Sequence, residues 1–292
     1  MAYLHSDREQ FRDAIDLAYE QTGVMVQAIE KDYYVTMLLR LLAQRMPYIV
    51  FKGGTSLSKC HKVIRRFSED IDITIDTLLS QGQKKKIKQA IVESAEELGM
   101  TIENLDETRS RRDYNRYVIA YDSVIPMASD ALKAAVLLET SYTAVSFPTV
   151  LLPVHSYIGD MMEQEAPDAI EEYNLNPFEM KVQGIDRTLA DKVFAVCDYY
   201  LQGKVAKHSR HLYDIYKLLP LVPQDENFKE LVKEVRAVRE QSVICPSALP
   251  EANVPELLEK IIKEKAYTEY GVSGMVRERR KAYEPTASRC TI

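Results

Sequence analysis

The chain has 292 residues, of which 46% are hydrophobic and 28% are charged, and these values are typical of a folded globular protein rather than a disordered or fibrous one. Its net charge of −6 argues against a protein that coats nucleic acid constitutively. No apolar run reaches the roughly 18 residues that a membrane-spanning helix needs, and the charged, amphipathic N-terminus is unlike a signal peptide, so we expect a cytoplasmic protein with no membrane partner.

The first elements expected are two helices, a strand and a third helix. Apolar residues recur at helical spacing through residues 8–45, which predicts two helices. Residues 47–54, PYIVFKGG, have the pattern of a short buried strand stopped by glycine, and residues 55–66 that of the helix that follows. Residues 69–76, EDIDITID, alternate between polar residues and isoleucine, which predicts a strand with two different faces.

The middle of the chain is mixed and its end is helical. A helix is expected over residues 84–98, followed by strands near residues 117–122 and 132–144. Amphipathic segments at residues 185–201 and 209–222 predict two more helices, and the rest is mostly helical with a polar tail.

Two prolines in the segment 146–160 mark a change of character between these parts. We therefore expect an α+β fold of two domains: a core of mixed sheet and helices over residues 1–146, and a mainly helical C-terminal domain over residues 147–292.

Two carboxylates stand close together in the alternating strand. Because residues two apart in a strand project from the same face, Asp70 and Asp72 lie side by side, and their charges repel. A cation resolves this conflict, and magnesium commonly takes one or two carboxylates together with substrate phosphates. Glu139 interrupts an apolar strand, where a charge requires a partner, so it is the candidate for a third carboxylate. The alternatives are a solvent-facing strand for the aspartates and an edge-strand position for Glu139.

A glycine turn precedes this strand. Gly53 and Gly54 allow the backbone to approach a phosphate closely, and the next helix begins with free N–H groups. The hydroxyls of Thr55 and Ser56 are possible additional donors. The pattern is not a Walker A loop, because no glycine precedes Lys59 as that motif requires. Phosphate contacts on one side and a metal on the other describe a nucleoside triphosphate site.

The motifs GGTSLSK (residues 53–59) and SEDIDI (residues 68–73) resemble those of the nucleotidyltransferase superfamily that shares the DNA polymerase beta catalytic core. Together with EKDYYVTMLLRLL before them, and with RTLADKVFAV and RHLYDIYKL after them, they resemble the AbiEii/AbiGii toxin family of type IV toxin–antitoxin systems, over roughly residues 25–220. The resemblance implies a nucleotidyltransferase-like sheet flanked by helices, with magnesium held by Asp70, Asp72 and Glu139.

The resemblance also assigns the remaining candidates. It implies nucleotide binding at the turn from Gly53 to Ser56, and the chain differs there from the common Gly-Ser pattern because Thr55 separates Gly54 from Ser56. The cations that flank this turn could add phosphate contacts, and they are Lys52, Lys59, Arg65 and Arg66. It implies that Lys192 contacts the triphosphate and that Asp214 is catalytic. The alternative for Asp214 is a structural carboxylate that pairs with Lys192 or Arg210.

The expected activity is transfer of a nucleoside monophosphate from an NTP to an acceptor hydroxyl, with a two-metal magnesium site and release of pyrophosphate. The resemblance alone implies that the acceptor is the 3′ end of tRNA and that an antitoxin is encoded alongside. Two other readings are a small-molecule or protein acceptor, and a module that binds NTP or RNA without catalysis.

Two further features of the composition bear on partners. The four cysteines show no CxxC pair or His/Cys cluster, which predicts free thiols at Cys60, Cys197, Cys245 and Cys290. RNA binding would require several basic clusters to converge on one face, and the clusters lie at residues 84–88, 109–116, 204–210 and 277–281.

Overall fold

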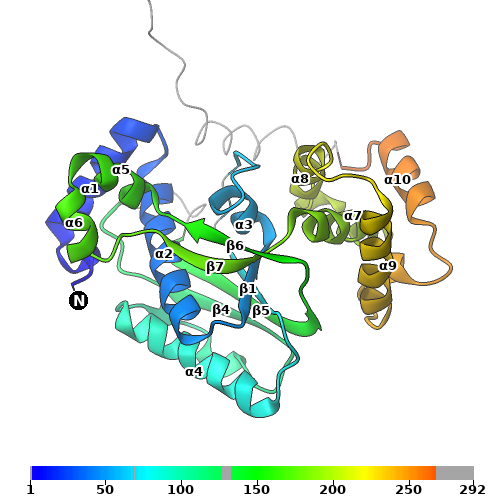
Figure 1. Ribbon diagram of the computed structural model, residues 1–292, viewed down its shortest axis with the longest axis horizontal. Coiled ribbons are helices and arrows are strands. Elements are labelled where there is room, and N and C mark those ends of the chain that lie inside the picture. The colour runs from blue at the N-terminus through cyan, green and yellow to red at the C-terminus, as the bar shows by residue number, and fades with distance from the viewer. Residues whose placement is uncertain (1, 67, 69, 127–132, 268–292) are drawn as a thin grey trace, which may run out of the picture. The chain divides into compact units, whose positions relative to one another are not determined.

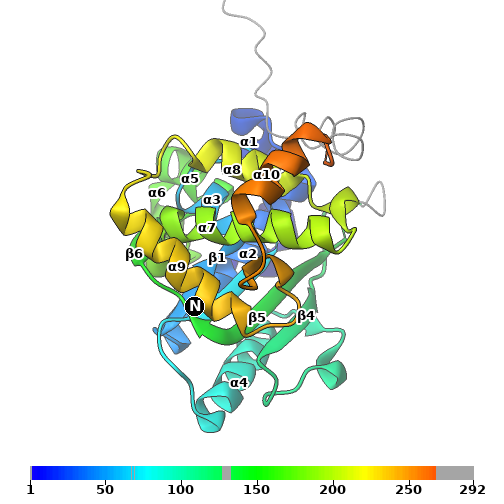
Figure 2. The same cartoon turned by 90° about the vertical axis from the view of Figure 1, so that its right-hand side faces the viewer.

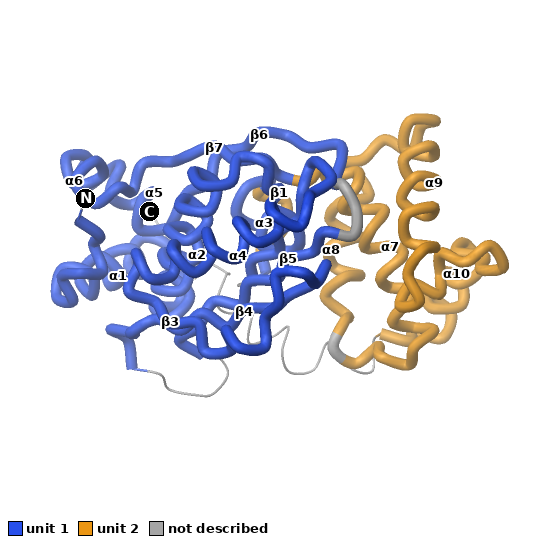
Figure 3. Tube along the Cα trace, turned by 90° about the horizontal axis from the view of Figure 1, so that it is seen from below, with its two compact units in different colours: residues 1–61, 66–182, 282–292 blue, residues 62–65, 183–281 orange. Residues whose placement is uncertain are grey.

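The structure is a computed structural model that describes residues 2–66, 68, 70–126 and 133–267. The chain divides into two compact units, which are coloured separately in Figure 3. Unit 1 contains the described parts of residues 1–61 and 66–182, and unit 2 contains those of residues 62–65 and 183–281. No helix within the described ranges is both long and apolar enough to cross a membrane.

Unit 1 is built on a mixed sheet (Figure 1). Its seven strands have the order β3-β4-β5-β2-β1-β7-β6. The strand bounds are β1 Ile49–Lys52, β2 Ile71–Ile75, β3 Thr101–Ile102, β4 Tyr114–Ala120, β5 Ala135–Val145, β6 Thr149–Val154 and β7 Phe178–Gln183. β1 runs antiparallel to β2 and parallel to β7, and β2 runs parallel to β5. β4 pairs antiparallel with both β3 and β5. The strands that carry the predicted site, β1, β2 and β5, are therefore neighbours in the middle of the sheet.

The helices of unit 1 cover this sheet. Their bounds are η1 Leu4–Ser6, α1 Arg8–Thr22, α2 Val26–Arg45, α3 Gly53–Lys59, α4 Gln81–Glu97, η2 Leu105–Glu107, α5 Tyr157–Glu165 and α6 Pro167–Glu172. α2 is almost wholly buried because it packs against α1, α4, α5 and β5, and it supplies Tyr33 and Leu38 to the core. α3 contacts both β1 and β2, which fixes the glycine turn against the strand of the two aspartates.

Unit 2 is helical, with bounds α7 Ile185–Leu201, η3 Val205–Lys207, α8 Arg210–Leu218, α9 Glu226–Glu240, η4 Pro246–Ala248 and α10 Val254–Lys263. α7 is its central helix and contacts α8, α9 and α10 (Figure 2). Phe194 of α7 packs with Val235 of α9, and Cys197 packs with Ile261 of α10. One amphipathic helix thus organises two small cores.

These observations confirm the expected α+β fold with a mixed sheet, flanking helices and a mainly helical C-terminal part. The predicted helix over residues 55–66 is an exception, because α3 begins at Gly53 and ends at Lys59. Lys62 adopts a left-handed φ of 56°, which an α-helix cannot accommodate, so the segment after α3 leaves the helical path.

The change of character at residue 146 does not mark a domain boundary between the sheet and the helices. β6 and β7 continue the sheet beyond it, and the two units divide between residues 182 and 183. β6 lies at the edge of the sheet, where proline is tolerated because one side of the strand needs no ladder donor. The prolines Pro148 and Pro153 therefore accompany an edge strand.

Cys60, Cys197 and Cys245 are buried free thiols, as expected. Burial raises the pKa of Cys197 to about 12, so this thiol stays protonated. Cys290 and the basic cluster at residues 277–281 lie outside the described residues.

Candidate active site

The turn between β1 and α3 brings the backbone against the Asp72 carboxylate. Gly53 has a φ of +82°, a left-handed conformation that favours glycine. A Cβ atom at this position would overlap the Asp72 side chain and lie 2.8 Å from its Cγ. Glycine therefore meets two requirements at Gly53, an unusual backbone angle and the absence of a side chain. The glycine turn and the aspartate strand, separate in sequence, form one site.

Strand register places a second carboxylate beside Asp72. β2 and β5 run parallel with Asp72 opposite Glu139. Adjacent strands lie about 4.8 Å apart, and residues at paired positions point to the same face of the sheet. Asp70 directly precedes β2 and lies two residues before Asp72. The structure thus brings Asp72 and Glu139 together at the centre of the sheet, with Asp70 at the start of the same strand.

Two cations flank these two anions. Lys52 of β1 is paired with Asp72, and Arg116 of β4 is paired with Glu139. The four residues Lys52, Asp72, Glu139 and Arg116 therefore form one row across four adjacent strands, which we call the charge row. The Nε atom of Arg116 lies 3.7 Å from Oε1 of Glu139, and both side chains are partly exposed. The row is electrically balanced, with the two negative charges at its centre.

Tyr114 adds a third neighbour to Glu139. Partial burial of this half-exposed side chain raises the pKa of Tyr114 to about 12, and the negative charge of Glu139 adds to this effect. The phenol is therefore a hydrogen-bond donor rather than an anion at neutral pH. Sequence reasoning missed Tyr114 and the role of Arg116, since only the register between β4 and β5 reveals them.

The donor set suits a hard divalent cation. Asp72 and Glu139 offer carboxylate oxygens, which magnesium prefers, and their adjacent like charges favour a cation between them. Gly53 itself places no side chain over the Asp72 carboxylate. Within residues 2–66, 68, 70–126 and 133–267, no three His, Cys, Asp or Glu side chains converge closely enough to hold a metal ion. The residues thus fit magnesium by their chemistry, with two carboxylates in place and no compact group of three.

The hydroxyls of Thr55 and Ser56 are turned into the protein. Thr55 Oγ1 donates to Ser68 Oγ at 2.9 Å, and Ser56 Oγ donates to the carbonyl of Gly53 at 2.9 Å. Both residues are buried. These bonds rigidify the turn and leave the backbone N–H groups of the first turn of α3 as the donors that face outward from the helix end.

Gly54 has its own close neighbours. A Cβ atom on it would lie 2.5 Å from an Arg66 guanidinium nitrogen and 2.8 Å from Ser68 Oγ. The segment that leads into β2 therefore packs directly on the glycine turn, and it carries a cation there. Sequence analysis offered Arg66 only as one of several flanking charges.

Lys59 has a partner inside unit 1. Its ammonium lies 2.5 Å from Asp32 Oδ1 and 2.6 Å from the carbonyl oxygen of His155, and its side chain is 6% exposed. The other oxygen of Asp32 accepts the N–H of Tyr157. These contacts tie α3 to α2 and to the start of α5. The predicted nucleotide contact of Lys59 stays a prediction, and Asp32 and the carbonyl of His155 already accept from two of the three donors of its ammonium.

In unit 2, Lys192 of α7 and Asp214 of α8 form a buried ion pair. Lys192 Nζ lies 2.7 Å from Asp214 Oδ2, and the side chains are 8% and 0% exposed. This pairing was expected under the alternative in which Asp214 is a structural carboxylate. Burial lowers the pKa of the neighbouring His211 well below its usual value, and the positive charges of Lys192 and Arg210 add to the effect.

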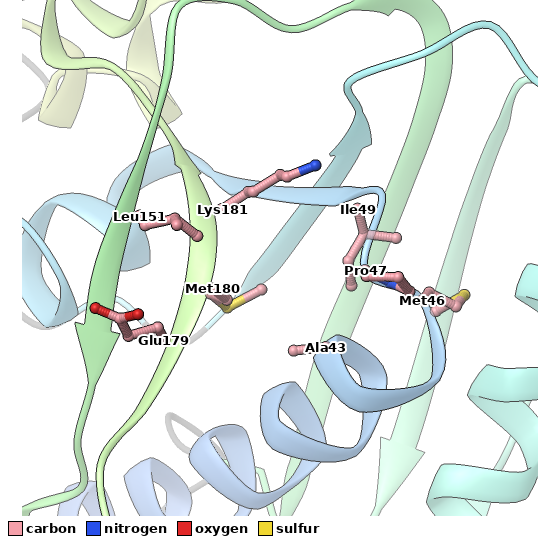
Figure 4. Close-up of a pocket in the computed structure, with 8 residues that line it drawn as sticks. All are labelled: Ala43, Met46, Pro47, Ile49, Leu151, Glu179, Met180 and Lys181. Atoms are coloured by element: carbon pink, nitrogen blue, oxygen red, sulfur yellow. The ribbon is translucent and has the colours of Figure 1, made fainter.

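A separate cavity lies at the other end of β1. It has a volume of about 280 Å³ and is lined mainly by apolar side chains, including Met46, Ile49 and Met180 (Figure 4). Ile49 begins β1, whereas Lys52 ends it beside Asp72. The charge row and the glycine turn are not part of this cavity.

Comparison with known proteins places the chain among toxins. A family model described as nucleotidyl transferase AbiEii toxin, type IV toxin–antitoxin system, matches residues 36–273. Among solved structures, the chain is similar to MenT4, a nucleotidyltransferase toxin from Mycobacterium tuberculosis, with 16% sequence identity, 93% of each chain covered and a TM-score of 0.49. No curated protein matches the chain.

Proposed function

Because the chain belongs to the AbiEii family of nucleotidyltransferase toxins from type IV toxin–antitoxin systems, we propose that it uses magnesium to transfer a nucleoside monophosphate from an NTP to the 3′ end of tRNA. Blocking that end would prevent aminoacylation and so stop translation and growth. The family implies an antitoxin partner and an NTP substrate. A tRNA-directed enzyme would act in the cytoplasm, the compartment expected from the sequence.

One observation carries the proposal: Asp72 lies against Gly53 on one side and in register with Glu139 on the other. A metal-dependent transfer needs carboxylates within reach of the phosphates, and this arrangement supplies both carboxylates at the end of the glycine turn. Asp70, Asp72 and Glu139 would hold magnesium, and the first-turn N–H groups of α3 would bind the phosphates. Bound magnesium would offset the charge that develops on the attacking and leaving oxygens.

The chain's own residues would perform the remaining steps. The acceptor hydroxyl oxygen attacks the α-phosphorus in line, its proton passes to one of the three carboxylates, and the bond to the leaving pyrophosphate breaks. Lys52 and Arg66, which flank the turn, are candidate contacts for the phosphates. The roles that the family motif implies for Lys192 and Asp214 are tested separately by the ion-pair variants described in the Discussion.

The test is direct. The full chain is incubated with magnesium, total tRNA and each labelled NTP in turn, together with Asp72→Asn and Glu139→Gln variants. We expect label at an RNA 3′ end from one preferred NTP, and a rate at least about a hundredfold lower for each variant, since each loses a charge needed at the phosphates. Asp13→Asn, an exposed carboxylate on α1, is the matched control and should react like the parent.

Other outcomes would replace the proposal. Label on protein or on a small molecule alone would rule out the tRNA acceptor. Growth arrest that persists with a folded, transfer-inactive Asp72→Asn protein would contradict toxicity through catalysis and would favour a module that sequesters NTP or RNA.

A further inference from the structure

The outer face of α8 combines one exposed and one partly exposed tyrosine ring with positive charge. Tyr216 is 72% exposed, and Lys217 lies over the rings of both Tyr213 and Tyr216, with Nζ at 5.7 Å and 5.5 Å from their centroids. Arg210 is exposed one turn before Tyr213. The hydroxyl of Tyr213 accepts the backbone N–H of Arg65, which brings a further exposed cation beside the helix. We call these five residues the α8 surface.

This face is distinct from the buried side of the same helix. Asp214 and Leu218 point into unit 2, and the apolar face of α8 packs on α7. Tyr213 and Tyr216 lie three residues apart, so their rings are neighbours on the opposite side. Single exposed apolar side chains are common on proteins, but adjacent tyrosines held under a lysine form a built feature.

The charged side chains in the stretch around α8 are positive, apart from one buried aspartate. Between residues 199 and 222, Asp214 is the only acidic residue, and it is fully buried and paired with Lys192. The cations Lys204, Arg210 and Lys217 belong to the same stretch. The stretch that contains α8 thus carries several cations beside two aromatic rings, and this combination complements a polyanion that carries flat bases.

We propose that the α8 surface binds the unpaired 3′ nucleotides of an RNA acceptor, with a base stacked on Tyr216 and phosphates paired with Arg65, Arg210 and Lys217. This inference rests on the proposed function, because it names where that acceptor is held. Bases stack on tyrosine regardless of their identity, while arginine and lysine contact the backbone, which is how single-stranded nucleic acid is commonly bound. The surface therefore recognises a single-stranded end and leaves base selection to other contacts.

The experiment measures binding without catalysis. A fluorescently labelled single-stranded RNA of about ten nucleotides is titrated with the full chain in the absence of NTP and metal, at several salt concentrations. Tyr216→Ala should raise the Kd by roughly five- to a hundredfold, because a stacked base loses its platform. Tyr216→Phe should bind like the parent, because the ring is kept. Tyr19→Ala, which removes a half-exposed tyrosine from α1 in unit 1, is the matched control and should change nothing.

The charge contribution has its own measurement. Arg210→Gln should weaken binding and reduce the slope of log K against log salt by about 0.7, the value for one phosphate contact on a single strand. An unchanged Kd for Tyr216→Ala, an equal loss for Tyr216→Phe, or an unchanged salt slope for Arg210→Gln would overturn the proposal. Formation of a dimer by the parent that Tyr216→Ala abolishes would overturn it as well, because the surface would then bind a second copy of the chain.

The failure of this inference can be separated from the failure of the proposed function. Asp72→Asn should lose transfer and keep the parental RNA Kd. If the parent transfers nucleotide to RNA while Tyr216→Ala keeps the parental Kd and RNA KM, the α8 surface is wrong and the function stands. If the parent labels no RNA but Tyr216→Ala weakens binding as expected, the surface stands as an RNA site and the transfer proposal fails.

Discussion

The buried ion pair between Lys192 and Asp214 offers the sharpest separation of a structural role from a functional one. With side chains 8% and 0% exposed and an N–O distance of 2.7 Å, each charge is stabilised by the other inside the protein. Removing one partner from such a pair costs about 3–5 kcal/mol, because an uncompensated charge stays buried. This is a large share of the roughly 5–15 kcal/mol that stabilises a typical domain.

We therefore expect Asp214→Ala and Lys192→Met each to lower the free energy of unfolding by about 3–5 kcal/mol. The double variant Lys192→Met/Asp214→Leu replaces both charges with apolar side chains and should recover most of that loss, since such replacements are often neutral. The assay is urea unfolding followed by circular dichroism. Lys229→Ala breaks an exposed ion pair with Glu226 on α9 and should barely move the midpoint.

Activity in the labelled-NTP assay then decides the role. If the pair only holds α7 to α8, the stable double variant should transfer nucleotide at nearly the parental rate. If Lys192 contacts the triphosphate, the double variant should be folded and inactive. A loss below about 1 kcal/mol for Asp214→Ala would refute the underlying reasoning, because other groups would then compensate the buried Lys192 charge.

Three further outcomes are expected. Gly53→Ala should destabilise the protein and abolish metal-dependent transfer, because its Cβ would overlap the Asp72 side chain. Gly23→Ala, with a similar φ of +67° but open space around it, should only destabilise the protein. Equal losses of activity in the two variants would contradict the close approach of Gly53 to Asp72. Arg116→Gln should tighten Mn²⁺ binding up to about fivefold by calorimetry, because the guanidinium competes with the metal for Glu139, and weaker binding would contradict this. The pKa of His211 is lowered in the folded protein, so below pH 6.5 the unfolded chain binds one proton more than the folded chain. The free energy of unfolding should therefore fall by up to about 1.4 kcal/mol per pH unit as the pH drops below 6.5. The measurement is the urea midpoint against pH, and a profile that His211→Gln leaves unchanged would refute this prediction.

Local sequence patterns predicted much of the central sheet. The alternation in residues 69–76 predicted β2 and the shared face of Asp70 and Asp72, and the charge inside an apolar run indicated that Glu139 needs a partner. Which partner it has was not predictable, because the register of β2 and β5 depends on tertiary assembly. The positions of Arg116 and Tyr114 beside Glu139 were not predictable either, because they depend on the register of β4 and β5.

Side-chain direction was less predictable than position. Thr55 and Ser56 are placed at the turn as expected, but their hydroxyls bond locally because both are buried. The partner of Lys59, Asp32, lies on a helix far away in sequence, so no local pattern could reveal that ion pair. Pro148, just before β6, and Pro153, within it, resembled a domain boundary. Edge strands and linkers both tolerate proline because neither needs an N–H donor at every residue.

The charge row bears on when a newly synthesised chain can become active. Its members Lys52, Asp72, Arg116 and Glu139 come from four segments, and the strand order joins segments distant in sequence through parallel pairings that form only after long stretches have been synthesised. A nascent chain still attached to the ribosome lacks the row until β5 has emerged and docked beside β2. Under the proposed function, activity would therefore appear only after β5 has docked beside β2, and no shorter nascent chain would carry it.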